Sequence, residues 1–387
     1  MSYFLTEQQS QIRDLARKFA HKDVEPLANQ IDHDEHTPAA LTHQAAALGF
    51  FGLAIPEAYG GAGESLTTAC LLLEEIAKAS PSYAGLLSVQ MILCPWLVLA
   101  KGSEAQKQRL LPRAASGEGL MAYSVSEPAG ALNVPGHLTR LTPDGPNWRL
   151  NGAKLFCTQG EATVYLVMCK TRVDGQEGYG CAIVPRDAPG FDVAPYENKL
   201  GWRGTNTGGL SFTDVLVTPD QLLGDPLTAG AHMDVNQASF IGHCAAALGC
   251  AEGLFDKTLA YVKERQLYGA PMHMLSPISN NLAIVFNKIE AMRSLVYTAA
   301  RLYEEGRHEL PMGTVCKSYV CDTAFECTHT LLQMWGGAGM MDATGVHRYF
   351  RDARTNMIAE AATEAHNAII AEHVLGLQRS VGALTFF

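Results

Sequence analysis

The sequence is poor in charged residues, and acidic residues outnumber the basic ones. Only 18% of its 387 residues are charged, whereas about a quarter is usual for a globular chain. The 29 basic residues against 39 acidic ones give a net charge of −10, which argues against nucleic acid or an anionic membrane as a partner. A low charged fraction also indicates that other subunits cover part of the surface, so we expect a homo-oligomer.

The chain shows neither a signal-like start nor a continuous apolar span. Its first nine residues include an acidic side chain and lack the basic start and apolar run of a signal peptide. Residues 79–100 carry no charge and are long enough to cross a bilayer. However, Pro81, Pro95 and several polar residues make this stretch neither continuously apolar nor continuously helical. We expect a buried helical region that could line an apolar ligand pocket, and no membrane insertion.

The ten cysteines follow no spacing typical of a metal site or a disulfide framework. Most lie in apolar helical patterns, and Cys316, Cys321 and Cys327 are five and six residues apart. That spacing fits neither a zinc knuckle nor a redox pair. We therefore expect no metal, and reduced thiols in a cytoplasmic protein.

The hydrophobic pattern divides the chain into three regions, and its length suffices for two or three domains. A helical region covers 1–119, short strands cover 120–230, and the helical period returns over 231–387. No helices separate the strands, which excludes a doubly wound sheet. The predicted fold class is α+β, with a small barrel- or sandwich-like β domain between two helical domains.

Three helices are predicted in the first region. The first is capped by Thr6 and is bent or ended at Pro26, and the others cover 39–48 and 66–79. The glycine-rich run 56–63 between them could be mistaken for a dinucleotide fingerprint. Since no βαβ unit surrounds it, we predict a connecting loop.

In the central region, Asn151-Gly152 is the strongest hairpin signal, because strand-like residues flank it on both sides. Further short strands are predicted over 163–169, 180–184, 191–194 and 210–217. In the last region, a helix ends near Tyr268-Gly269 with no strand signal after it, and more helices follow, including 314–334 and 364–377.

A single carboxylate stands out in the stretch 348–364. After three arginines and an aspartate within 348–354, no charge occurs until Glu360, which is surrounded by small apolar residues on a predicted bend between helices. Burial raises the pKa of a carboxyl group, and a general base works best with a pKa near the working pH. The alternative is a solvated glutamate on a helix surface, and this stretch alone favours that alternative.

Six segments, in this order along nearly the whole chain, are similar to the acyl-CoA dehydrogenase family of flavoenzymes. They are 102–107 with Leu111-Pro112, 123–128, 151–158, 263–269, 333–339, and 348–354 with Glu360. Each segment is a weak signal, but their joint order is specific. The resemblance implies FAD between the β domain and a C-terminal four-helix bundle. It also implies a neighbouring subunit that completes the site, in a dimer or, more usually, a tetramer.

The resemblance implies flavin contacts for five residues of the β domain. Tyr123, Val125 and Ser126 would lie along the polar edge of the flavin. Phe156 would cover the ring where the family usually has tryptophan, and Thr158 would bond near flavin N5.

For the helical domain, the resemblance implies contacts to the rest of the cofactor. Arg265 would meet the pyrophosphate, since arginine forms charge-assisted hydrogen bonds with phosphate, and Tyr268 would lie at the adenine end. The remaining implied cofactor contacts are Gln333, Gly336 and Gly337, on the dinucleotide of the adjacent subunit, together with Thr363 and Glu364.

The reaction implied by the resemblance converts an acyl-CoA to a trans-2-enoyl-CoA. Glu360 would remove the α-proton while hydride leaves the β-carbon for flavin N5. The backbone N–H of Glu360 and a ribityl hydroxyl of FAD would polarise the thioester carbonyl. The flavin carries the redox chemistry and the protein supplies orientation. An electron-transfer flavoprotein is the expected electron acceptor.

Several residues depart from the family pattern near the substrate. Leu132 stands where a serine commonly meets the thioester ligand, and Phe240 where many members have an arginine near the CoA arm. Ala361 and Ala362 replace a glycine and a threonine, and Ser276 replaces a cofactor-binding glutamine. Leu132, Phe240 and Ala361 are the predicted substrate contacts.

These departures leave other interpretations open. The acyl group could be carried by a carrier protein instead of CoA, could be bulky, or FAD could be held weakly; neutral drift explains the departures equally well. A third interpretation is a non-catalytic or non-redox member of the same scaffold. The presence of Glu360 and Thr158 argues against that third interpretation.

Overall fold

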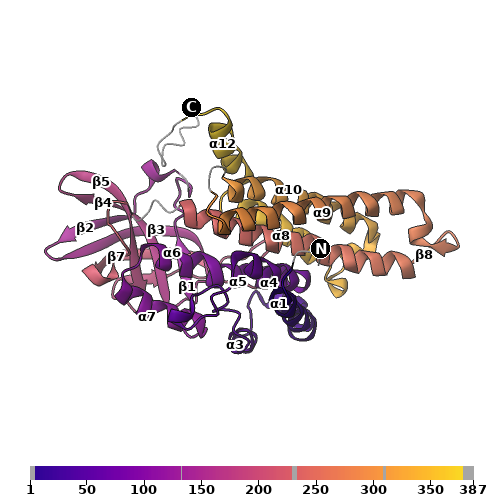
Figure 1. The fold of residues 1–387 in the computed structure, drawn as a ribbon, viewed down its shortest axis with the longest axis horizontal. Helices are drawn as coiled ribbons and strands as arrows, with labels where there is room; N and C mark the ends of the chain where they lie inside the picture. The colour runs from indigo at the N-terminus through magenta and orange to yellow at the C-terminus, as the bar shows by residue number, and fades with distance from the viewer. Residues whose placement is uncertain (1–4, 132, 229–232, 308–310, 378–387) are drawn as a thin grey trace.

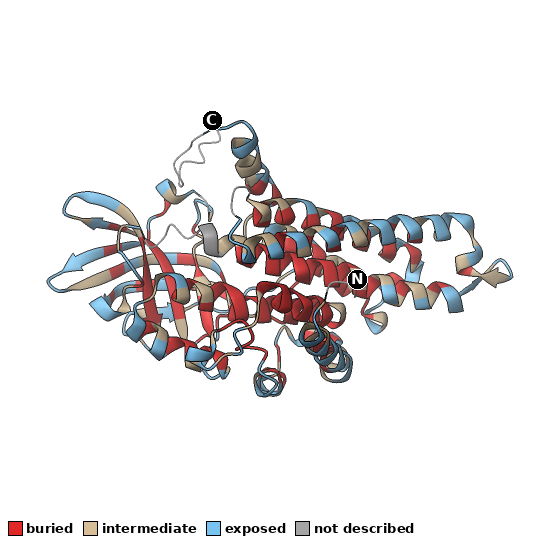
Figure 2. Ribbon diagram, viewed as in Figure 1, coloured by how far each residue is buried: buried red, intermediate tan, exposed pale blue. Residues whose placement is uncertain are grey.

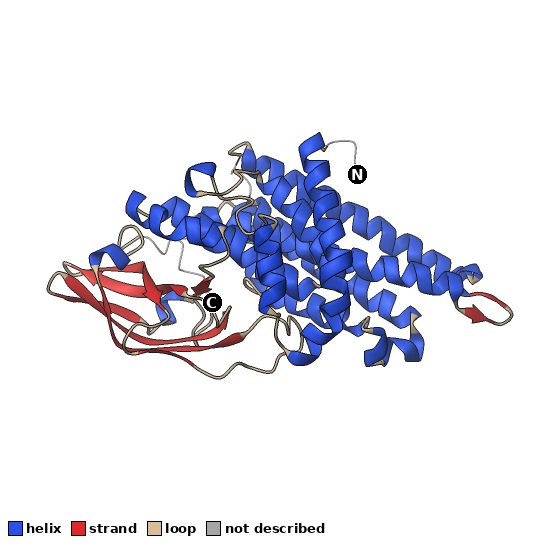
Figure 3. Ribbon diagram, turned by 90° about the horizontal axis from the view of Figure 1, so that it is seen from below, coloured by secondary structure: helices blue, strands red, loops and turns tan. Residues whose placement is uncertain are grey.

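The computed structural model describes residues 5–131, 133–228, 233–307 and 311–377. Figure 1 shows the β-sheet at one end of the long axis and the long C-terminal helices extending to the other, with the N-terminal helices packed along them. Seen from below, the large sheet lies at one end with helices packed against it, and a short two-stranded hairpin lies at the other end (Figure 3). The predicted α+β class, with a β domain between two helical regions, is confirmed.

The N-terminal region consists of helices joined by loops, with no strand among its described residues. Its helices are α1 (Glu7–Phe19), α2 (Ala28–Asp34), α3 (Ala39–Ala47), α4 (Leu66–Ala79), α5 (Pro81–Ser88), α6 (Cys94–Lys101) and α7 (Glu104–Ala115). The predicted cap is confirmed, since the Thr6 side chain accepts from the backbone N–H of Gln9 in a capping box. Helix α4 has the predicted bounds because Ser65 caps its start.

The uncharged stretch 79–100 is largely buried, as predicted, and its helix is interrupted at Ser80, whose extended backbone separates α4 from α5. Helix α5 continues through a π turn, Val89–Leu93, into α6. The predicted interruption is therefore found before Pro81 but not at Pro95, because the wider turn accommodates a residue that has no N–H to donate. Two helices, Pro81–Lys101 and Asn236–Glu264, could cross a membrane by length and composition only. Since 83% and 89% of their apolar windows are buried inside the protein, they have the character of core helices.

The β domain contains one seven-stranded sheet in the order β1-β4-β2-β3-β7-β6, with β5 paired to β4. Strand β4 lies parallel to β1 and β2 and antiparallel to β5. The sequence patterns did not indicate β1 and β2. The strands are β1 (Met121–Ser124), β2 (Arg140–Asp144), β3 (Asn147–Thr158), β4 (Val164–Val173), β5 (Gln176–Pro185), β6 (Phe191–Val193) and β7 (Thr207–Val217).

The hairpin predicted at Asn151-Gly152 was wrong. Strand β3 runs through this pair, and its hairpin with β2 turns at Gly145-Pro146. Gly152 instead lies at an irregularity in the β3–β7 pairing, with φ +138, and a Cβ there would lie 2.6 Å from the Cα of Thr139. The Asn-Gly signal therefore reflects a bulge and a close backbone approach, not a turn.

The C-terminal region packs its helices against the N-terminal ones. Its helices are α8 (Met233–Glu264), α9 (Ser276–Glu304), α10 (Met312–Met334), α11 (His347–Ile358) and α12 (Thr363–Val374). Helix α8 crosses α4 closely, because a Cβ at Gly249 or Gly253 would lie 2.2 or 2.3 Å from a carbonyl oxygen of α4. Figure 2 shows the densest burial along α4, α5 and α8.

A short hairpin follows α8 where no strand was predicted. Strands β8 (Gln266–Leu267) and β9 (Ala270–Pro271) pair across Tyr268-Gly269, and both turn residues have positive φ. Two-residue strands are too short for a period-2 pattern to show in the sequence, so that prediction was wrong.

Candidate active site

Glu360 lies on the turn between α11, which ends at Ile358, and α12, which begins at Thr363. This is the predicted bend between helices. Glu360 and Ala361 have φ angles of +56 and +77, a left-handed region that disfavours any residue with a Cβ by about 1–2 kcal/mol. Strain of this kind persists only where the surroundings fix the backbone, and it is common at functional sites.

Buried donors hold the carbonyl oxygens of this turn. Lys317, a fully buried residue of α10, donates from Nζ to Asn356 O at 2.7 Å and to Ala361 O at 3.4 Å. His366 of α12 donates from Nε2 to Glu360 O at 3.0 Å. Two helices thus fix the strained backbone on either side of the carboxylate.

The Glu360 carboxylate has one paired and one unpaired oxygen. Ser239, fully buried on α8, donates from Oγ to Oε1 at 2.9 Å. Oε2 is buried and has no hydrogen-bond partner in the described part of the chain. Burial raises the pKa of Tyr123 on β1 and of Cys94 on α6, with Glu360 a smaller contributor to both shifts. The unpaired carboxylate oxygen is the atom that could accept a proton from carbon.

The predicted residues near this turn differ in their exposure. Phe240, next to Ser239 on α8, is 7% exposed and packs edge-to-face on His366, with ring centroids 4.7 Å apart. Thr363 is buried and donates to Asp322 Oδ1 at 2.6 Å, whereas Glu364 is exposed. Leu132 lies outside the described residues. These roles remain predictions.

His366 should make the stability of the fold depend on pH. Burial, and then the charge of Lys317, lower the pKa of His366 to about 4, against about 6.5 in an unfolded chain. The unfolded state therefore binds more protons between pH 6.5 and 4, so this contribution is complete above pH 6.5 and is lost as pH falls to about 4. The total is about 3 kcal/mol. We expect His366→Gln to flatten the fall in the unfolding midpoint between pH 7.5 and 4.5.

Chemical unfolding at pH 7.5, 6.0, 5.0 and 4.5 would measure this dependence. His373→Gln is the matched control, because His373 lies on the same helix and is exposed. Its unfolding should follow the wild-type pH dependence. A His366→Gln variant that loses stability in acid as steeply as wild type would contradict the assignment.

The residues predicted along the flavin edge are brought together. The backbone N–H of Leu155 donates to Ser126 O at 2.8 Å, which places β3 beside the segment that follows β1. Phe156 comes next, with φ +56 and a side chain 68% exposed. Val125 is half-buried nearby. An exposed aromatic ring on a strained backbone, beside this polar edge, fits a planar apolar ligand such as a flavin ring.

Thr158 follows on the same strand. It is half-buried and pairs with Thr207 of β7, so it continues the edge that begins at Phe156.

A second group of predicted residues gathers at the other end of the helices. Arg265, Tyr268, Gln333, Gly336 and Gly337 are all exposed, and Tyr268 is 95% exposed. A Cβ at Gly336 or Gly337 would meet nothing within 4 Å. Packing of this chain therefore does not require a glycine at 337, whose φ is not in the left-handed range. A ligand or another chain that approaches the backbone would explain it, and in this respect the residues fit a dinucleotide.

One chain does not bring the two groups together. Trp335 stacks on Tyr261 at 4.2 Å, which places the second group beside the end of α8, whereas Ser239 is near its start. About 37 Å of helix separates Ser239 from Glu264 at 1.5 Å per residue. Ser276, at the start of α9, is also exposed.

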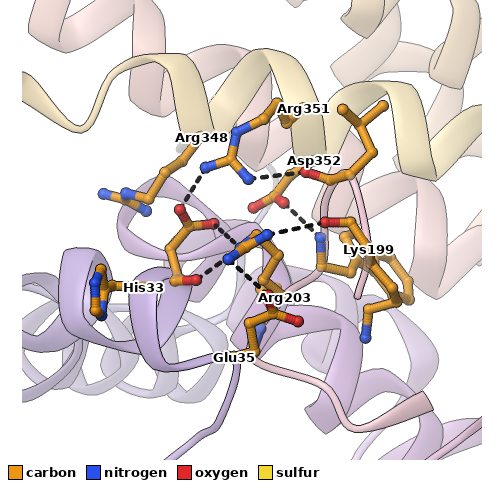
Figure 4. A network of polar contacts seen from close by, with 12 residues as sticks. His33, Glu35, Lys199, Arg203, Arg348, Arg351 and Asp352 are labelled. Carbon is orange, nitrogen blue, oxygen red and sulfur yellow. Dashed lines mark hydrogen bonds and ion pairs between the residues drawn. The ribbon is translucent and has the colours of Figure 1, made fainter. Parts of the chain in front are cut away.

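A set of polar contacts around Arg351, here called the clamp, joins the three regions of the chain (Figure 4). Arg351 of α11 pairs with Asp32 of α2 and donates to Leu200 O. Arg203, on the connection before β7, also binds the α2 segment, through Asp32 O at 2.8 Å. Trp202 N donates to Asp352 Oδ1 at 2.6 Å, and burial raises the pKa of that carboxyl to about 6. These contacts fix the orientation of α11, which ends just before Glu360.

A polar cavity of about 420 Å³ adjoins this clamp, away from Glu360. It is lined by residues 33–36, Glu161, 196–199, Arg203 and 205–207. Arg203 and Lys199 already have protein partners there, and the lining mixes both signs of charge. The Glu360 turn differs from this cavity, because backbone strain and a buried, unpaired carboxylate oxygen coincide there.

Three residues that contact the Glu360 turn were not predicted. Ser239, Lys317 and His366 come from three different helices. Lys317 could have been noticed, since it is the one charged residue between Met312 and Cys321. Ser239 and His366 give no such signal in the sequence.

Family models match all three regions. The acyl-CoA dehydrogenase N-terminal domain matches residues 6–118, the middle domain 122–215 and the C-terminal domain 238–375. An acyl-CoA dehydrogenase of Bacillus subtilis is 32% identical over 378 residues, covering 96% of this chain and 99% of that protein.

Solved structures agree with these matches. Butyryl-CoA dehydrogenase from Megasphaera elsdenii superposes with a TM-score of 0.92 at 31% identity, covering 97% of this chain and all of the other. A chain in the structure of the electron transferring flavoprotein of Acidaminococcus fermentans has a TM-score of 0.93 at 31% identity, with the same coverage.

Proposed function

The chain belongs to the acyl-CoA dehydrogenase family, and from this premise we propose that Glu360 removes the α-proton of an acyl-CoA thioester as the β-carbon loses hydride. The protein is an FAD-dependent oxidoreductase acting on CH–CH bonds. The observation that carries the assignment of the base is the Glu360 carboxylate, on a strained turn, with Oε2 buried and unpaired. When bound, FAD supplies the hydride acceptor.

Residues of this chain provide proton removal, charge stabilisation and the binding of the cofactor. Glu360 takes the proton on Oε2, and its backbone N–H stabilises the charge that develops on the thioester oxygen. Tyr123, Val125, Ser126 and Thr158 would hold the flavin edge, and Phe156 would cover the ring face. The burial of Oε2 keeps water from this oxygen, which strengthens its electrostatic interactions.

We further propose that a partner subunit completes the cofactor site. The second group of residues, at the far end of α8, cannot reach the flavin edge of its own chain across about 37 Å. Arg265, Tyr268, Gln333, Gly336 and Gly337 would instead bind the cofactor of a neighbouring copy. The low charged fraction of 18% supports an oligomer. The domain limits 1–119, 120–230 and 231–387, and a cytoplasmic location, belong to the same proposal.

For the electron acceptor, we propose an electron-transfer flavoprotein. The likeness to a chain in the structure of such a flavoprotein supports this choice.

Anaerobic titration with acyl-CoAs of graded chain length tests the function. We expect one length class to bleach the flavin absorbance stoichiometrically, and added electron-transfer flavoprotein to restore the colour. The second candidate is an acyl group on a carrier protein, which the buried Phe240 at an expected arginine position favours. Bleaching by the acyl-carrier thioester but by no acyl-CoA would select it. No bleaching by either would point to a non-redox member of the scaffold.

A further inference from the structure

Ser239 makes a contact with the carboxylate that the family resemblance did not supply. Its Oγ lies 2.9 Å from Glu360 Oε1, and the residue has no exposed surface. Ser239 and Glu360 are 121 residues apart, so the contact exists only because α8 passes under the turn between α11 and α12. The other carboxylate oxygen is buried without a partner in the described residues.

From this geometry we propose that Ser239 is a positioning residue that holds Oε1 of Glu360, so that Oε2 alone receives the substrate α-proton. The proposal rests on the proposed function, since it needs Glu360 as the base. A hydroxyl that donates to a carboxylate favours its charged form and restrains its rotation, which keeps the reactive oxygen in a near-attack position.

The titratable groups around Glu360 decide how the pH dependence of flavin bleaching can test the positioning role of Ser239. From α12, His366 has a pKa lowered to about 4 by burial and then by Lys317. From α6 and β1, burial raises the pKa of Cys94 and Tyr123 well above their usual values. From α10, Lys317 contacts backbone carbonyls of the turn. His366, Cys94 and Tyr123 therefore stay uncharged between about pH 5 and 9. From α8, His243 also contacts this turn, through Asn356 O, so the acidic limb in the rate of bleaching is interpreted only by comparing variants at Ser239.

Rapid mixing of the FAD-loaded enzyme with its best thioester, from pH 5 to 9, tests the proposal. Ser239→Ala should slow flavin bleaching by about 10- to 100-fold and move the acidic limb to higher pH. With an α-deuterated thioester the isotope effect should rise, because proton removal becomes slower relative to the other steps. Ser239→Thr keeps the hydroxyl and should recover the wild-type limb, at least in part.

Ser88→Ala is the matched control. Ser88 is a buried serine of α5 whose Oγ has no hydrogen-bond partner in the described residues. Loss of a hydroxyl there should change neither the acidic limb nor the isotope effect. The proposal falls if Ser239→Ala keeps the wild-type rate, limb and isotope effect. It also falls if Ser88→Ala or Ser239→Thr slows bleaching as much as Ser239→Ala does, since packing would then explain the loss.

Glu360→Gln separates this inference from the proposed function. If that variant bleaches at the wild-type rate, the base is wrong and the role of Ser239 falls with it. If Glu360→Gln is inactive while Ser239→Ala behaves as wild type, only the positioning role is overturned.

Discussion

Glu360→Gln should retain FAD and lose substrate-driven bleaching of the flavin by roughly 10²- to 10⁴-fold, the range that a positioned base contributes. Glutamine has nearly the same shape, and its amide oxygen can still accept from Ser239 at the place of Oε1. It cannot take a proton from carbon, however. The turn keeps its donors from Lys317 and His366, so the fold and the cofactor site should survive.

The visible spectrum would report FAD content, and stopped-flow absorbance would report bleaching. Glu305→Gln, at an exposed carboxylate that follows α9, is the control and should behave as wild type. A Glu360→Gln enzyme that bleaches at an unchanged rate would show that another group removes the proton.

The bend that carries Glu360 could be predicted because its signal is local, but a role for Glu360 could not, since the stretch alone favours a solvated glutamate and only the resemblance over nearly the whole chain implies a base. Helix ends also follow local signals: α4 begins at the predicted Leu66, where Ser65 caps it. By contrast, the residues that hold Glu360 belong to helices that meet only in the folded chain. Ser239 is one serine in an apolar stretch, and no periodicity distinguishes its hydroxyl from that of any buried serine.

The β domain shows the opposite failure, in which a strong local signal misleads. Asn-Gly favours the left-handed conformation that hairpin turns need, but a bulge that lets another strand come close needs the same freedom. At Gly152 the neighbouring backbone of Thr139 decides between the two, and the sequence near Gly152 does not contain that information. The exposed Phe156 is similar, since a ligand position explains it better than any rule of burial.

Lys154→Met should destabilise the β domain by about 3–5 kcal/mol and weaken FAD retention. Lys154 is fully buried on β3 and donates from Nζ to Glu127 Oε1 at 2.7 Å and to Val125 O at 2.9 Å. Removing one partner of a buried ion pair leaves the other charge buried without compensation, which is the costly case. Burial acts to raise the pKa of Glu127, but the Leu138 N–H and Lys154 bring it below its usual value. In the variant this carboxylate stays buried and loses the cation that favours its charged form.

The same pair supports the predicted flavin edge, because Lys154 holds the carbonyl of Val125 between Tyr123 and Ser126. Unfolding curves and the ratio of flavin to protein absorbance would measure both effects. Lys170→Met on β4 of the same sheet is the control, since Lys170 Nζ contacts a backbone carbonyl, Pro135 O, at 2.6 Å, and its removal leaves no buried carboxylate behind. Adding Glu127→Gln to Lys154→Met should recover part of the lost stability, because the stranded charge is then gone. If the double variant is instead as unstable as the two single losses added together, the pair is not coupled, and the polar donors at 138 and 139 alone would have to account for the order of this loop.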